Sequence, residues 1–504
     1  MIDRRAVLGG ALVLATPRVG WAQSEPETLE ALAEGLSRQP HRNPAMELAP
    51  PFDDLTYNSF RAIRPAEGGA AGIPLGDGFS ADLLPPGFYF QDRVAVEIER
   101  SGELESVEFD PSLFSYGERY FDTPPQMSAS DRANMGFSGA RLRTAYREAD
   151  VTDEFFVTQG ASYFRAVSRE TLYGLSSRAL AIGTGGAAPE EFPVFTRLRL
   201  HEAQGGRARL DALIESPSLT GAARLVIMPG EPTNIDVDLV LFPRVTLDTV
   251  GISPLTSMYF KGPLRDVVAD DFRPRVHDSD ALHIENGAGE MLWRPLSNPA
   301  ALQTSAFADR SPRGFGLIQS ARRFADFEDP EAAYHRRPSA WIEPQGDWGA
   351  GSVMLVEIPT DDEFFDNIVA FWRPAEPLVG GKKYRFGYRI SLGSDPLADR
   401  ASRIEVVQSR SGLVHDRPGF LQYIVDFKGT DLQALSPMVE ATEGVVEGVS
   451  AYPIVERGHL RVGFQFKPAD AAASELRLVL RSDDASRWSD VWLHRWTPSR
   501  EGGP

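Results

Sequence analysis

Carboxylate and aromatic side chains gather in one stretch of the sequence, residues 275–374. Three segments there each carry tryptophan: RVHDSDALHIENGAGEMLWRPL, SPRGFGLIQSARRFADFEDPEAAYHRRPSAW and QGDWGAGSVMLVEIPTDDEFFDNIVAFWRP. Flat rings stack on the apolar faces of sugars, while carboxylates bind hydroxyls and move protons. The stretch therefore favours carbohydrate chemistry. Among the residues interleaved with these tryptophans are His277, Asp278, Asp280, Glu328, Asp329, Glu363 and Asp366.

Hydrolysis of a glycoside needs one protonated carboxyl and one ionised carboxylate, so two of these acids would have to differ in environment. Asp366 follows Phe364 and Phe365 and precedes the apolar run IVAFW, which predicts partial burial and a raised pKa. Asp278 lies between His277 and a serine, groups that can orient an ionised carboxylate. The alternative for each aspartate is an ordinary position in a turn or at the end of a strand.

The aromatic residues allow two interpretations. Trp293, Trp341, Trp348 and Trp372 are either core residues or platforms for a sugar. Trp348 lies between an aspartate and a glycine in a polar loop, and of the four it is the least expected in a core. Arg336 and Arg337, close to Tyr334, either bind sugar hydroxyls or form a solvated turn.

Other familiar chemistries lack their motifs. The sequence has no P-loop, no HExxH and no GxSxG, and the GTGG at residues 183–186 is typical of a turn. His277 and His283 are six residues apart, but no third ligand follows at a recognisable spacing, so we predict no metal and no cofactor.

The composition is that of a soluble globular protein, with 42% hydrophobic and 24% charged residues among 504. Its net charge of −19 argues against a nucleic-acid partner and is compatible with a neutral polymer. There is no cysteine, which excludes disulfides and thiol chemistry. Residues 1–22 combine paired arginines, a short apolar run and small residues before Ala22, which predicts a twin-arginine-like signal peptide and export.

Strand patterns dominate the rest of the chain and predict an all-β fold. We expect residues 23–47 to hold a short amphipathic helix, with Leu29, Leu32, Ala33 and Leu36 on one face. Alternating or apolar runs at 197–200, 208–215, 224–228 and 235–242 predict strands of a large β-sandwich spanning 48–374. The Pro- and Gly-rich 375–383 reads as a linker, and short strands over 384–504 predict a smaller, immunoglobulin-like sandwich.

Several motifs resemble one family. ASYFRAV, YGLSSRALAI, EEFPVF, PGEPTNIDV, HDSDALHI, WRPLSNP, PRGFGL, FEDPEAAY, RPSAW, GDWGAG and VEIPTDDEFFDNIVAFW are similar, in order, to the periplasmic glucan biosynthesis proteins G and D, and the twin-arginine-like leader favours the D branch. The resemblance covers nearly the whole chain after the leader. It implies a periplasmic protein with a galactose-mutarotase-like β-sandwich followed by an immunoglobulin-like one.

The resemblance also implies a function and roles for residues. Family members act on osmoregulated periplasmic glucans, which are β-1,2-linked glucose polymers, and some are inverting β-1,2-glucanases. Asp366 would be the general acid and Asp278 the general base, acting on water directly or through a relay. We expect the substrate to contact Tyr334, His277, Arg337, Trp341, Trp348, Trp293 and Glu363.

Two other functions stay open at this stage. One is a transglycosylase acting on the same glucan, and the other is a non-catalytic glucan-binding scaffold of the export machinery. The resemblance further implies a homodimer and a functional link to a membrane glucosyltransferase.

Overall fold

The computed structural model describes residues 27–66, 72–264, 271–397, 403–484 and 486–498. The predicted signal peptide, residues 1–22, lies outside these ranges. The described chain is nearly all β, which confirms the predicted fold class. Three short α-helices accompany the strands: α1 (Leu29–Ser37), α2 (Tyr57–Arg61) and α3 (Ala129–Asn134).

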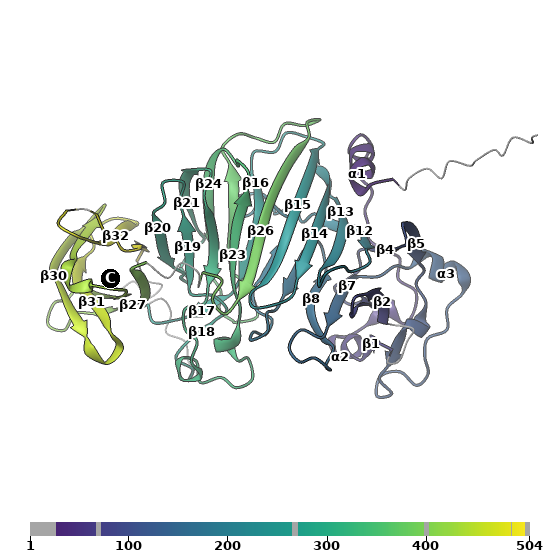
Figure 1. Cartoon of the computed structure of the whole chain (residues 1–504), viewed down its shortest axis with the longest axis horizontal. Helices are drawn as coiled ribbons and strands as arrows, with labels where there is room; N and C mark the ends of the chain where they lie inside the picture. The colour runs from purple at the N-terminus through teal and green to yellow at the C-terminus, as the bar shows by residue number, and fades with distance from the viewer. Residues whose placement is uncertain (1–26, 67–71, 265–270, 398–402, 485, 499–504) are drawn as a thin grey trace, which may run out of the picture.

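Two large sheets face each other and form the main sandwich (Figure 1). The first has the strand order β2 (Gly72–Gly76), β3 (Phe79–Leu84), β7 (Gly139–Thr144), β8 (Asp153–Gln159), β9 (Tyr163–Ala166), β10 (Ser176–Arg178), β16 (Val250–Ser257), β25 (Ile368–Pro374), β24 (Ala350–Glu357) and β21 (Gln303–Arg310), with β11 (Leu180–Ile182) also paired to β16. Among the described residues, β9, β16 and β25 are the strands of this sheet that lead to the candidate site.

The second sheet runs through both sandwiches. Its strand order is β29 (Ser436–Ala441), β32 (Ser474–Arg481), β33 (Val491–Trp496), β20 (Met291–Pro295), β19 (Ala281–Glu285), β22 (Gly314–Ile318), β23 (Ser339–Gln345), β26 (Tyr384–Gly393), β15 (Thr233–Pro243), β14 (Leu219–Met228), β13 (Ala208–Glu215), β12 (Val194–Leu200), β4 (Ala95–Arg100) and β5 (Glu103–Val107). The strands predicted at 197–200, 208–215, 224–228 and 235–242 are found here as β12 to β15.

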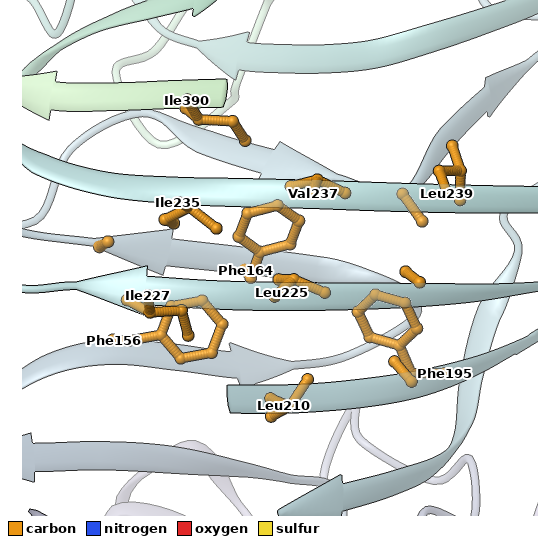
Figure 2. Close-up of a cluster of buried hydrophobic side chains, with 14 of the residues drawn as sticks. Phe156, Phe164, Phe195, Leu210, Leu225, Ile227, Ile235, Val237, Leu239 and Ile390 are labelled. Carbon is orange, nitrogen blue, oxygen red and sulfur yellow. The ribbon is translucent and has the colours of Figure 1, made fainter. Parts of the chain in front are cut away.

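Alternation along these strands builds the core. Ile235, Val237 and Leu239 on β15 point to one side, where they meet Phe156 and Phe164 from the opposite sheet (Figure 2). Side chains alternate across a strand, so one face of each sheet is apolar and the two faces close on each other. The other face of β13 to β15 is covered by the predicted helix α1, whose buried side chains include Leu29 and Ala33.

The C-terminal sandwich combines β29, β32 and β33 with a separate four-stranded sheet, ordered β27 (Glu405–Leu413), β28 (Leu421–Lys428), β31 (His459–Lys467) and β30 (Val445–Ile454). Seven strands in two sheets enclose a second hydrophobic core. The two sandwiches are continuous, because β33 pairs in parallel with β20 at Leu292–Val491 and Trp293–Trp492.

The predicted start of the second sandwich, residue 384, is wrong. β26 pairs with β15 on one side and with β23 on the other, so residues 384–393 form a central strand of the main sandwich. The Pro- and Gly-rich 375–383 therefore connects β25 to β26 across the main sandwich rather than linking two domains. The chain enters the smaller sandwich only after β26.

Two short pairs complete the architecture. β1 (Ile63–Pro65) pairs with β6 (Phe114–Tyr116), and β17 (Tyr259–Lys261) pairs with β18 (Val276–His277). The β17–β18 pair lies along the lower rim of the main sandwich in Figure 1. Among the described residues, no helix is long and apolar enough to span a membrane.

Candidate active site

Asp278 is placed by the β17–β18 pair. Tyr259 of β17 is in register with His277 of β18, and the Asp278 backbone N–H donates to the carbonyl of Met258 at 2.9 Å. His277 itself is completely buried, stacked on the Tyr259 ring and in edge contact with Phe327. The imidazole therefore forms part of the packed support under Asp278.

Asn367 ties the segment that carries Asp366 to the same pair. Its buried side chain accepts from the Tyr259 N–H at 2.8 Å and donates to the carbonyls of Tyr259 and Ile358, each at 3.0 Å. Asp366 immediately precedes Asn367, and β25 begins at the next residue, Ile368. The amide thus fixes the backbone of Asp366 against the backbone next to Asp278, and residues that are 88 positions apart in the sequence meet at one rim.

Asp278 is a buried carboxyl with a raised pKa. Its exposed fraction is 7%. Burial raises its pKa from 3.8 to about 6, Arg337 opposes the shift, and the negative charge of Asp366 adds to it. A base with a pKa near 6 is matched to proton transfer near neutral pH.

Asp366 is more open to solvent, with 36% of its side chain exposed. Burial raises its pKa too, while Arg165 and Arg337 act in the opposite direction. An Nη of Arg165 lies 3.5 Å from Oδ2 of Asp366. Both aspartates therefore hold their protons more tightly than a free aspartate and share one electrostatic environment, in which Arg337 acts on each.

The two arginines are positioned by one turn, at Gly174. Its carbonyl accepts from Arg165 at 2.7 Å, and the carbonyl of Tyr173 accepts from Arg337. A Cβ at residue 174 would lie 3.1 Å from both Cβ and Cδ of Arg337, so a larger residue there would require the Arg337 side chain to shift by a few tenths of an ångström. Nε of Arg337 in turn lies 3.5 Å from Oδ1 of Asp278.

A second network fixes the acidic side of the site. The Tyr334 hydroxyl donates to Glu363 at 2.6 Å, and the Arg273 guanidinium donates to Glu363 and Asp329, each at 2.8 Å. Tyr334 opens the short 3₁₀ turn 334–336, and Arg337 at the end of this turn packs over its ring. Glu363 and Tyr334 are thus held by a cation rather than free to rotate.

Exposed phenylalanines flank these charges. Phe272 is 85% exposed, Phe364 is 93% exposed and Phe365 is 49% exposed. Phe272 lies between Asp271 and Arg273, and the other two lie between Glu363 and Asp366. Large exposed apolar side chains beside a polar site mark a surface that contacts a ligand.

This arrangement is suited to acid/base chemistry on a polar ligand with apolar faces. It offers two carboxyls with raised pKa values, arginines that can bind hydroxyls, and flat rings open to solvent. Among the described residues, no three His, Asp or Glu side chains come together in a way that could hold a metal ion.

The sequence profile of the family described as "Periplasmic glucan biosynthesis protein, MdoG" matches residues 25–496. The chain belongs to this family. The MdoG-family chain is 40% identical over 479 residues to "Glucans biosynthesis protein G" of Vibrio cholerae, covering 94% of this chain and 86% of that protein.

Two Shewanella relatives carry the same name. The chain is 38% identical over 510 residues to glucans biosynthesis protein G of Shewanella frigidimarina, covering 98% of this chain and 89% of the relative. For glucans biosynthesis protein G 1 of Shewanella oneidensis, the identity is 40% over 450 residues, with 88% and 81% covered. The predicted resemblance and the periplasmic location are confirmed, and the MdoG-family protein takes part in glucan biosynthesis.

In this MdoG-family protein, the structure brings Asp278, Asp366, Tyr334, Arg337 and Glu363 close to one another, and their roles in binding and catalysis stay predictions. Other predicted ligand contacts are corrected. His277 has no exposed surface, so it supports the site from below and does not touch a substrate.

The three tryptophans predicted to contact substrate are buried. Trp293 packs in the core of the C-terminal sandwich, and Trp341 is 1% exposed on β23, against the backbone of Gly314 and Gly316. Trp348 is 6% exposed: its Nε1 donates to the carbonyl of Gly387 at 3.2 Å, and its ring packs on Trp372. Because these large rings are packed in the protein interior, they do not present a face on which a sugar could stack.

The sequence reasoning missed Arg165, Arg273 and the exposed phenylalanines. Arg165 lies on an ordinary alternating strand, although the ASYFRAV motif that contains it was noted. The sequence pattern predicts Phe364 and Phe365 only as neighbours that bury Asp366, whereas both rings are exposed. The available signal was the position of all three phenylalanines between charged residues.

Proposed function

We propose that this periplasmic MdoG-family protein cleaves or remodels a β-1,2-linked glucan by acid/base catalysis, with inverting hydrolysis as the leading reaction. The observation that carries the proposal is the pair Asp278 and Asp366, both with raised pKa values and both fixed to one rim through Tyr259 and Asn367. Glucan as the substrate is supported by family membership.

In the proposed reaction Asp366 gives its proton to the glycosidic oxygen as the bond to the anomeric carbon breaks. Asp278 removes a proton from water, directly or through one bridging hydroxyl, and the resulting hydroxide forms the new bond to that carbon. Arg337 lies 3.5 Å from Asp278, and its positive charge lowers the pKa of both carboxyls. The inverting assignment predicts that the two carboxyls are about 6.5–9.5 Å apart, or further with a bridging water.

The test is incubation of the mature protein and of Asp366→Asn with linear β-1,2-glucan, with products resolved by mass and linkage. We expect shorter linear oligosaccharides from the wild-type protein and none from the variant. Cyclic or re-linked products with total glucose conserved would assign transglycosylation instead. Unchanged polymer with both proteins, despite measurable binding, would reject catalysis in favour of a glucan-binding scaffold.

Phe364 gives a second prediction, about binding. A ring that is 93% exposed beside Asp366 is suited to stack on a glucose unit, an interaction worth about 1 kcal/mol. We expect Phe364→Ala to raise KM about fivefold with little change in kcat, as measured by initial rates over a range of glucan concentrations. Phe364→Trp keeps a flat ring and should retain wild-type KM; an unchanged KM in the alanine variant would exclude stacking there.

A further inference from the structure

A polar cavity lies between the two sandwiches. It has a volume of about 440 Å³ and is lined by Arg275, the segment Ser320–Arg323, Asp326, β27, Asp426, Arg457 and His459. The main sandwich supplies the first half of this lining and the C-terminal sandwich supplies the rest. We call this cavity the inter-sandwich cleft.

The carboxylates of the inter-sandwich cleft are already engaged. Asp426 is fully buried and accepts from the Arg461 guanidinium at 2.6 and 2.8 Å. Asp326 is paired with Arg323 at 2.7 Å. Each carboxylate forms its ion pair with one arginine, and its charge also acts at longer range on one further arginine of the cleft, Asp326 on Arg275 and Asp426 on Arg410. The arginines around the cleft still outnumber these two carboxylates.

Several arginines around the cleft lack a close counter-charge. Among the residues that the structure describes, Arg322, Arg410 and Arg457 have no carboxylate within 4.0 Å, and Arg275 has only Asp280, at 3.9 Å. Arg410 lies on β27, close enough to Arg275 and Arg457 for their charges to add to burial in lowering its pKa. Although the protein has a net charge of −19, arginines outnumber carboxylates in the lining of this cleft.

Arg322 shows that the excess charge extends inward. Its guanidinium donates to three neutral oxygens, the carbonyls of Arg337 and Ser394 and the hydroxyl of Ser339. Its Nε is buried without a hydrogen-bond partner in the described structure. Unscreened like charges in a partly buried cavity are unfavourable, and a bound anion would remove that cost.

We propose that the inter-sandwich cleft binds an oxyanion of the phosphate class. Guanidinium groups bind phosphate oxygens through paired N–H donors, and a volume of 440 Å³ exceeds that of inorganic phosphate alone. The same chemistry serves free phosphate or a phosphate carried on a sugar. This inference does not depend on catalysis by Asp278 and Asp366.

The test is calorimetric titration of the wild-type mature protein with inorganic phosphate and with glucose 6-phosphate at pH 7.5, with sodium chloride adjusted to constant ionic strength. We expect saturable binding, weakened at least tenfold in Arg410→Gln/Arg457→Gln. Arg417→Gln is the matched control, because Arg417 lies in the same sandwich but is already paired with Glu447 at 2.7 Å. This variant should bind as the wild-type protein does.

The relative affinities for the two compounds distinguish the possible ligands. Tighter binding of glucose 6-phosphate than of phosphate assigns the cleft to a sugar-borne anion, and equal binding assigns it to the free ion. No saturable binding of either compound by the wild-type protein would overturn the proposal, whatever the variants do. Equal binding by the double variant and the wild-type protein would overturn the location.

Discussion

An Asp278→Asn variant is expected to lose glucan cleavage by a factor of about 10²–10⁴ and yet to be more stable than the wild-type protein at pH 7.5. The loss follows from removal of the proposed base. The gain in stability follows from the pKa of the carboxyl, which is about 6 in the folded protein against 3.8 when unperturbed. The folded state binds this proton more tightly than the unfolded state does.

Because of Asp278, the free energy of unfolding of the wild-type protein depends on pH. Below pH 3.8 the carboxyl is protonated in both states and costs nothing. Between pH 3.8 and 6 the unfolded chain releases the proton while the folded protein keeps it, so stability falls as the pH rises. Above pH 6 the full cost is present, up to about 3 kcal/mol, and a neutral asparagine avoids it.

Urea denaturation at pH 7.5 and pH 3.5 measures this effect. The free energy of unfolding of Asp278→Asn should exceed that of the wild-type protein at pH 7.5 and match it at pH 3.5. Asp122→Asn, at an exposed position, is the control and should change little at either pH. A variant that is less stable at pH 7.5, or that still cleaves glucan, would contradict the role given to Asp278.

Glu357→Gln is expected to lower the free energy of unfolding by about 3–5 kcal/mol. Glu357 on β24 has no exposed surface, and it accepts from Arg294 on β20 at 3.2 Å. The backbone N–H and hydroxyl of Ser297 donate to its other oxygen at 2.7 and 2.9 Å. Loss of the carboxylate leaves the Arg294 charge buried without a counter-charge.

Urea unfolding at pH 7.5 checks this value. Glu34→Gln is the matched control, because Glu34 is paired with Arg38 on the exposed surface of α1 and should cost less than 1 kcal/mol. Replacement of both Glu357 and Arg294 by methionine should recover most of the loss. Equal, small effects at the buried and the exposed pair would show that the charge of Arg294 is satisfied in another way.

Local sequence pattern predicted most strands and the helix α1, because side-chain alternation depends only on neighbours in the chain. The local pattern assigned β26 to the wrong sandwich, because it does not show which strands a segment pairs with. Tyr384, Phe386 and Tyr388 alternate equally well in either sandwich, and the preceding proline and glycines resemble an interdomain linker. Pairing with β15 and β23 is decided by distant residues, which the local pattern does not contain.

Where chemistry and family motif agreed, as for Asp278 and Asp366, the structure places the predicted residues near each other. The site was mispredicted where residue type alone was used. Trp348 was expected at the surface because its loop is polar, but Gly346 and Gly349 adopt positive φ values and turn the loop so that the ring packs inward. Arg165 was missed because a single arginine on an alternating strand carries no local sign of its partner across the site.

The parallel pairing of β20 with β33 means that the two hydrophobic cores share a hydrogen-bonded boundary. Trp293, from the main sandwich, also packs in the core of the C-terminal one. Loss of the C-terminal sandwich would therefore leave an open strand edge and an uncovered indole on the remainder. A deletion at the boundary between the sandwiches therefore removes part of the packing of both.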